Sequence, residues 1–153
     1  MPWFLDFVGY QDQEFIIKEI AILHNGGDRC YNYFITGPRK QLDSSTIFHQ
    51  YQMHKLRWDW GDYEFNEVMM DIARKLREDT VYIKGKEKFE FMKRILPRPN
   101  FVELEGIPSF KELNNCVFER CEVRHGNHCA RRKVYELKHF SDNSPNYFIN
   151  LNI

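Results

Sequence analysis

Two apolar segments near the N-terminus, followed by a glycine-rich turn, limit the possible folds of this chain more than any other feature. Trp3 to Gly9 and Phe15 to Leu23 are dense in apolar residues and bounded by turn formers, which is typical of buried strands. Asn25-Gly26-Gly27-Asp28 supplies the positive-φ residues of a tight hairpin turn, and the alternating segment Cys30 to Thr36 can return beside the second strand. The sequence therefore predicts an antiparallel meander of three strands.

Helices alternate with short strands in the rest of the chain. The segment from Asp43 to Leu56 has a weak helical pattern, and Asp62 is the predicted N-cap of an amphipathic helix. The apolar positions of that helix share one face: Phe65, Val68, Met69, Ile72, Ala73 and Leu76. The other predicted elements are strands at Val81 to Ile83 and Phe101 to Leu104, and helices at Gly85 to Leu96 and His128 to Phe140. We therefore predict one α/β domain over residues 1–140, with a mixed sheet and flanking helices, and an irregular C-terminal arm over residues 141–153.

The composition indicates a single domain without a strong overall charge. At 153 residues the chain can bury one core, and an aromatic content of 16% argues against disorder. Lys plus Arg and Asp plus Glu both number 22, so any basic surface must be local. The N-terminal segment carries Asp6 and lacks the basic start of a secretory signal, and no segment reaches the roughly 20 apolar residues of a membrane helix. We expect an intracellular protein that does not enter a membrane.

Three segments of the chain resemble motifs of the DnaQ-type 3′–5′ exonucleases, which have an RNase H-like fold. In that family a strand carrying Asp-x-Glu precedes a strand similar to Phe15 to Leu23. Val81 to Leu96 is similar to the second motif, and residues 128–134 are similar to the third. The family's functional positions fall here on Asp6, Val8, Lys88, His128 and Lys133. The resemblance implies an RNase H-like sheet, in which an antiparallel three-strand meander is followed by parallel strands.

Most of the carboxylates that such an exonuclease needs are missing. Two-metal phosphodiester hydrolysis requires several carboxylates to hold two divalent cations about 3.5–4 Å apart. Of the family's four acidic positions only Asp6 remains, because the other three hold valine or lysine. We therefore expect no metal-dependent exonuclease activity, and we expect Lys88 or Lys133 to form a buried ion pair with Asp6. If the alignment is shifted by a residue or two, Glu87 or Glu90 would supply a carboxylate instead.

A set of soft ligands near the C-terminus predicts a zinc site. Cys121-x3-His125-x3-Cys129 offers two thiolates and an imidazole. Glu19 lies in a predicted buried strand, one face of which would hold Phe15, Ile17, Glu19, Ala21 and Leu23. A buried carboxylate requires a partner. We therefore expect Glu19, Cys121, His125 and Cys129 to form a closed, structural zinc site.

Other arrangements of these residues are possible. Cys116 or His128 could replace one ligand. Without a metal, Cys129 could pack as a small hydrophobic residue, with His125 solvated and Glu19 at the surface. The same ligand set resembles that of the Maelstrom domain, a branch of the RNase H-like fold in which a Glu-Cys-His-Cys set binds zinc. That resemblance implies that RNA cleavage without the usual carboxylates is possible.

Basic residues gather in the two segments that an RNase H-like sheet would bring together. We predict a local basic groove that binds phosphates through Lys84, Lys86, Arg124, Arg131 and Arg132. Trp58, Trp60 and Tyr63 could stack on unpaired bases beside it. In the alternative interpretation, the charges belong to solvated helix faces interleaved with glutamates, and the tryptophans are core anchors.

Taken as hypotheses about function, these features favour a catalytically degenerate, zinc-stabilised RNase H-like module that binds single-stranded RNA or a protein partner. One alternative is an unconventional, metal-independent nuclease that cleaves single-stranded RNA. Another is a structural domain that dimerises through its aromatic surface. A continuous basic groove would favour RNA, whereas an exposed apolar patch would favour a protein partner.

Overall fold

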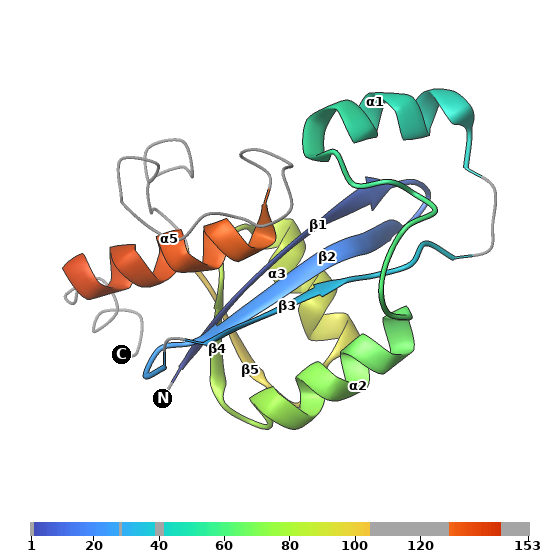
Figure 1. Cartoon of the computed structure of the whole chain (residues 1–153). Helices are drawn as coiled ribbons and strands as arrows, with labels where there is room; N and C mark the ends of the chain where they lie inside the picture. Colours follow the sequence, from blue (N-terminus) through green and yellow to red (C-terminus); the bar gives the residue numbers. More distant parts are fainter. Residues whose placement is uncertain (1, 28, 39–41, 105–128, 145–153) are drawn as a thin grey trace.

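The computed structural model describes residues 2–27, 29–38, 42–104 and 129–144 of the chain. In these segments five strands form one mixed sheet in the order β3-β2-β1-β4-β5 (Figure 1). The strands are β1 (Trp3–Gln11), β2 (Phe15–His24), β3 (Cys30–Phe34), β4 (Thr80–Ile83) and β5 (Asn100–Glu103). The described helices are α1 (Ser44–His54), α2 (Phe65–Leu76), α3 (Lys86–Ile95) and α5 (Ala130–Asn143). The predicted α/β class and mixed sheet are confirmed.

The strand directions follow from the connections between the strands. β1, β2 and β3 are joined by short turns and pair antiparallel, which confirms the predicted meander. β4 runs parallel to β1, and β5 runs parallel to β4. Parallel pairing needs crossover connections that return the chain to the same end of the sheet. The segment containing α2 provides the first crossover, and α3 provides the second.

A β-bulge at Lys18 changes which side chains of β2 share a face. Val8 lies opposite Glu19 and Gly9 lies opposite Ile17, so Lys18 is an extra residue in β2. Gly9 is required there, because a Cβ atom at this position would lie 1.9 Å from the Ile16 carbonyl oxygen. The predicted common face of β2 is therefore wrong. Ile17 packs with the core on one side of the sheet, whereas Glu19 faces the other side.

Helices cover both faces of the sheet (Figure 1). α2 and α3 pack on one face, over a core that includes Leu5, Phe7, Ile20, Ile22, Val68, Ile72, Leu76, Ile83 and Met92. α5 packs on the other face, over a smaller core that includes Phe4, Ala21, Leu23, Tyr82, Ala130, Val134 and Leu137. α1 lies beyond one end of β1 and β2 (Figure 1). Glu19 faces this second side, and α5 carries Lys133 and Glu136, which are described below.

Several predicted helix boundaries need correction. α2 begins after Glu64 rather than at Asp62, because Glu64 and Glu67 form a reciprocal capping box. α5 is capped by the Cys129 side chain, which accepts a hydrogen bond from the Arg132 backbone N–H. This helix continues to Asn143, so the predicted end at Phe140 is three residues too early. Residues 145–153 of the predicted arm lie outside the described residues.

Candidate functional site

Asp6 lies where the parallel strands β1 and β4 separate. The last residue of β4, Ile83, pairs with Leu5, so β4 does not extend alongside Asp6. The chain then turns at Gly85, whose φ of 109° is accessible to glycine, and enters α3 at Lys86. Open α/β sheets place their ligands at such carboxyl ends of parallel strands. The fold therefore places the Asp6 carboxylate at a position suited to a functional site.

Two lysine side chains contact the Asp6 carboxylate. Lys88 Nζ, from the first turn of α3, donates a hydrogen bond to Asp6 Oδ1 at 2.7 Å. Lys133 Nζ, from α5, lies 3.8 Å from Asp6 Oδ2. Asp6 is fully buried, and Val8 beside it in β1 is a buried apolar residue. The prediction that a lysine approaches Asp6 within salt-bridge reach is confirmed for both lysines.

Burial and the neighbouring carboxylates shift the pKa of Lys133 in opposite directions. Desolvation lowers the pKa of Lys133, and the positive charge of Lys88 lowers it further. The carboxylates of Asp6, Glu19 and Glu136 raise the pKa of Lys133 and so favour its charged form. A buried ammonium without those acids would be strongly disfavoured. Asp6, Glu19, Lys88, Lys133 and Glu136 therefore form an interdependent set, named here the Asp6 cluster.

Glu136 is a member of the Asp6 cluster that the sequence interpretation missed. Desolvation raises the pKa of Glu136 to about 7, although Arg132 and Lys133 oppose the shift. Glu136 Oε1 lies 3.3 Å from Arg132 Nε, whereas the buried Oε2 atom has no hydrogen-bond partner among the residues that the structure describes. One signal was available, because Lys133 falls on the same helical stripe as Ala130 and Leu137 and therefore requires a nearby acid.

Glu19 is buried, as predicted, and its carboxylate has polar partners within the described segments. Oε1 accepts a hydrogen bond from the Ala130 backbone N–H at 2.9 Å, so Glu19 stabilises the N-terminus of α5. Oε2 accepts one from the Asn32 side chain at 2.9 Å. Asn32 lies on β3, which is adjacent to β2 in the sheet. These partners satisfy much of the hydrogen-bonding need that motivated the zinc prediction.

Two of the four predicted zinc ligands lie together. Cys129 Sγ is 4.0 Å from Glu19 Oε2. Two ligands of a tetrahedral zinc ion, one sulfur and one oxygen, are separated by roughly 3.5 Å. Cys121 and His125 lie outside the described residues, as do Cys116 and His128. Within the described segments, no group of three or more His, Cys, Asp or Glu residues could hold a metal. The separation of Glu19 and Cys129 is compatible with two ligands of one zinc ion, and the other two predicted ligands are not among the described residues.

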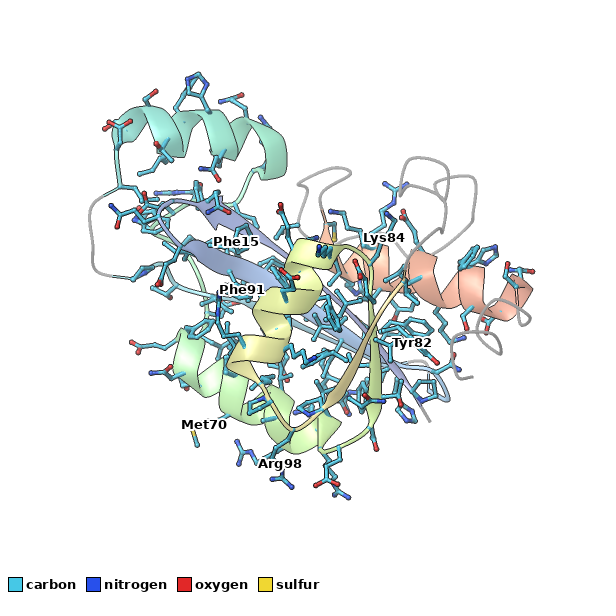
Figure 2. The ribbon with its side chains drawn as sticks, turned by 180° about the vertical axis from the view of Figure 1, so that it is seen from behind. Phe15, Met70, Tyr82, Lys84, Phe91 and Arg98 are labelled. Carbon is cyan, nitrogen blue, oxygen red and sulfur yellow. The ribbon has the colours of Figure 1, made fainter. Side chains whose placement is uncertain are left out.

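Two of the five basic residues predicted to bind nucleic acid interact with other side chains of α5. Arg132 forms an ion pair with Glu136, and the Arg131 guanidinium lies 5.9 Å from the centre of the Tyr135 ring. Lys84 is half-buried in the turn between β4 and α3 (Figure 2), whereas Lys86 is exposed. Arg124 lies outside the described residues.

The three aromatic residues proposed to stack on bases occupy different environments. Trp58 packs edge-on against Tyr10, with ring centres 5.2 Å apart, and its carbonyl oxygen accepts a hydrogen bond from Lys18. Trp60 and Tyr63 are 41% and 47% exposed. Trp58 is therefore a packing residue, whereas the other two present ring surface to solvent.

Lys18 holds the loop that carries these aromatic residues. This fully buried bulge residue donates hydrogen bonds from Nζ to the carbonyl oxygens of Ile35 at 2.6 Å and Trp58 at 3.0 Å, and to that of Trp60. Burial lowers the pKa of Lys18 to about 8, and Asp59 partly opposes this shift. All three donors of an ammonium group have acceptors, which explains how a lysine can be buried at this position.

Comparisons with known proteins do not assign the chain to a family. No protein-family model, curated protein or solved structure matches it. Among the helices of the described segments, none has the length and apolar character needed to cross a bilayer. The geometry of the Asp6 cluster and of the surrounding surface is thus the basis for the functional proposals below.

Proposed function

We propose that this chain is a non-catalytic RNase H-like module that acts by binding a partner protein. The strand order β3-β2-β1-β4-β5, with an antiparallel meander and two parallel strands, supports the RNase H-like assignment. The observation that carries the proposal is the contact of two lysine side chains with the buried Asp6 carboxylate.

The chemistry of the Asp6 cluster argues against two-metal hydrolysis. Divalent cations would have to displace the ammonium groups of Lys88 and Lys133 from Asp6. Positive charge from both lysines would also repel the incoming metal ions. Glu87 and Glu90, the alternative carboxylates on α3, are exposed and line a groove that is described below. The cluster therefore serves to hold α3 and α5 against the sheet.

A protein partner is favoured over RNA by the distribution of charge. Arg131 and Arg132, two of the predicted phosphate-binding residues, interact with side chains of α5 itself. The chain carries no net positive charge that would attract a polyanion. Binding surfaces between proteins tolerate such a neutral balance, because their affinity comes mainly from buried apolar and aromatic anchors.

Zinc remains part of the proposal as a structural ion. Glu19 and Cys129 would supply two ligands, and Cys121 and His125 would supply the others. When bound, the ion would crosslink the segment that precedes α5 to β2. No step of the proposed function requires the metal as a reactant.

Nuclease assays test the proposal directly. End-labelled single-stranded RNA and DNA are incubated with the protein in Mg²⁺, in Mn²⁺ and in EDTA. We expect no shortening of either strand under any condition. Metal-dependent cleavage that Asp6→Ala abolishes would refute the non-catalytic assignment, and cleavage in EDTA would instead support the unconventional nuclease.

Single-stranded RNA binding is the second candidate, because Trp60 and Tyr63 each pack on a residue of β3 and still expose ring surface to solvent. Trp60 packs on Phe34 with ring centres 5.3 Å apart, and Tyr63 packs on Tyr33 at 6.0 Å. Base stacking on such rings is sequence-tolerant. Fluorescence anisotropy with a labelled oligouridylate tests it. Binding that Trp60→Ala and Tyr63→Ala both weaken at least fivefold would establish RNA as the ligand.

A further inference from the structure

An open groove lies on the α2 and α3 side of the sheet, away from α5. It is lined by the end of β1, the start of β2, the N-terminal turn of α2 and one side of α3. Three phenylalanines among its lining residues contact one another. The ring centres of Phe7 and Phe15 are 5.5 Å apart, those of Phe7 and Phe91 are 5.5 Å apart, and those of Phe15 and Phe91 are 5.9 Å apart. Figure 2 shows Phe15 at the start of β2 and Phe91 on α3.

These aromatic residues are not completely covered by the protein. Phe7 is buried, but Phe15 and Phe91 are only half-buried. An aromatic cluster of this kind offers a large apolar contact area with few rotatable bonds to immobilise. The groove therefore has a partly exposed aromatic floor, which suits an apolar or aromatic side chain of a ligand.

The cations that line this groove already have partners. Lys88 donates its hydrogen bond to Asp6, and the Arg94 guanidinium lies 5.4 Å from the centre of the Phe91 ring. Of the acids that line the groove, Glu64 forms the capping box at the N-terminus of α2. Glu14, Glu87 and Glu90 are exposed, and none forms an ion pair within the described segments. The charge that the groove offers to a ligand is therefore negative.

We propose that this groove docks a basic peptide segment of a partner protein, one that combines arginine or lysine with an apolar side chain. The apolar side chain would pack on Phe15 and Phe91, and the cations would pair with Glu14, Glu87 and Glu90. Arg94 over Phe91 is an internal example of a guanidinium on this floor. Phosphate groups would meet the same carboxylates with repulsion, so RNA does not suit this groove. The inference rests on the proposed binding function and names the chemistry of the partner.

The experiment uses a defined probe. A fluorescein-labelled peptide of nine residues, in which arginine alternates with leucine, is titrated with the whole chain at low salt, and binding is followed by anisotropy. The same peptide is then added to ¹⁵N-labelled protein, and amide shifts are mapped. We expect the largest shifts at Phe15, Glu87, Glu90 and Phe91. The double substitution Glu87→Gln with Glu90→Gln should weaken binding about five- to tenfold, because it removes two of the carboxylates that pair with the arginines of the peptide. Both residues are exposed, so the variant should still fold.

Matched controls separate this docking from general attraction. Glu78→Gln changes an exposed glutamate that pairs with Arg98 outside the groove, and it should alter the affinity less than twofold. A peptide with glutamate in place of arginine should not bind. The proposal would be overturned if both peptides bind with equal affinity, or if the double variant binds as tightly as the parent. It would also be overturned if the amide shifts are confined to other surfaces of the protein.

Other occupants give distinct results. If the parent is a dimer in sedimentation velocity and the double variant is a monomer, the occupant of the groove would be a second copy of the chain. That result would overturn the proposal. If the double substitution Arg39→Ala with Lys40→Ala makes the peptide bind more tightly, the occupant of the groove would be the chain's own segment after Pro38. That result would also overturn the proposal. The nuclease assay is independent of these readouts. Cleavage activity would refute the non-catalytic assignment, whereas loss of peptide binding would refute only this docking site.

Discussion

The Nζ atom of Lys88 lies 2.7 Å from Oδ1 of Asp6, although 82 positions separate the two residues in the chain. The Asp6 side chain is fully buried, and that of Lys88 is 27% exposed. The lysine extends over the Phe7 ring, with Nζ 5.4 Å from the ring centre. This contact joins the first turn of α3 to the centre of the sheet, and it occupies the carboxylate that a metal ion would need.

Replacing Lys88 should destabilise the protein. Lys88→Met keeps the aliphatic stem but leaves Asp6 with Lys133 at 3.8 Å as its nearest cation. Breaking a buried ion pair from one side leaves an inadequately compensated charge, and we expect a loss of about 2–4 kcal/mol in unfolding free energy. Urea denaturation measures it. The control is Lys86→Met, an exposed lysine two positions away, which should change stability by less than about 0.5 kcal/mol. Equal losses for the two variants would mean that the Asp6 contact is unimportant.

Glu136 should make stability dependent on pH. The ordinary pKa of 4.5 is raised to about 7 in the folded protein, so the folded state binds the proton more tightly than the unfolded state. The contribution of this group to stability is therefore fully present below pH 4.5 and is lost as pH rises through 7. Glu136→Gln removes the cost of burying the charged form. At pH 8 the variant should be more stable than the parent by about 1–3 kcal/mol, and near pH 4.5 the two should be similar.

Denaturation at several pH values checks the Glu136 prediction. Glu90→Gln, an exposed glutamate on α3, is the matched control and should alter stability by less than about 0.5 kcal/mol. A Glu136→Gln variant that is less stable than the parent at pH 8 would show that the ion pair with Arg132 outweighs the desolvation of Glu136. The prediction would then be wrong.

Lys18 should be needed to hold the loop that carries Trp58 and Trp60. Lys18→Met fills a similar volume but leaves the carbonyl oxygens of Ile35, Trp58 and Trp60 without this donor. We expect a loss of about 2–4 kcal/mol in unfolding free energy, because buried acceptors would lose their partner. Tryptophan fluorescence should shift to longer wavelength as the loop loosens. Lys93→Met, at an exposed position, is the control, and a silent Lys18→Met variant would contradict the anchoring role.

The zinc prediction can be tested by metal content. The purified chain should contain about one equivalent of zinc, and Cys121→Ser, Cys129→Ser and Glu19→Gln should each lower both the zinc content and the Tm. Chelators and acidic pH should destabilise the parent, because thiolate ligands lose the metal on protonation. Cys30→Ser, at a half-buried position at the start of β3, should leave the metal content unchanged. A metal-free, stable parent would overturn the prediction and leave Glu19 as a helix-capping residue.

The extent to which the candidate site could be predicted from sequence differs between its members. An ion pair of Asp6 with Lys88 or Lys133 was predicted because a resemblance in motif order placed the three residues together, and a buried carboxylate requires a cation. Glu136 was missed, because its burial depends on how α5 is rotated against the sheet. The basic groove was predicted from the clustering of lysine and arginine in two segments, but side-chain partners such as Glu136 for Arg132 depend on tertiary contacts.

The sequence by itself determined the type and order of the described strands and helices, because apolar periodicity, turn residues and helix caps are local properties. Only the tertiary structure decided which side chains of β2 face α5. The bulge at Lys18 arises from pairing with β1 at Gly9, where the two backbones approach closely. Side chains alternate along a strand, so one inserted residue moves Glu19 to the opposite face from Ile17. That shift places the Glu19 carboxylate against the N-terminus of α5, and no local pattern in β2 records it.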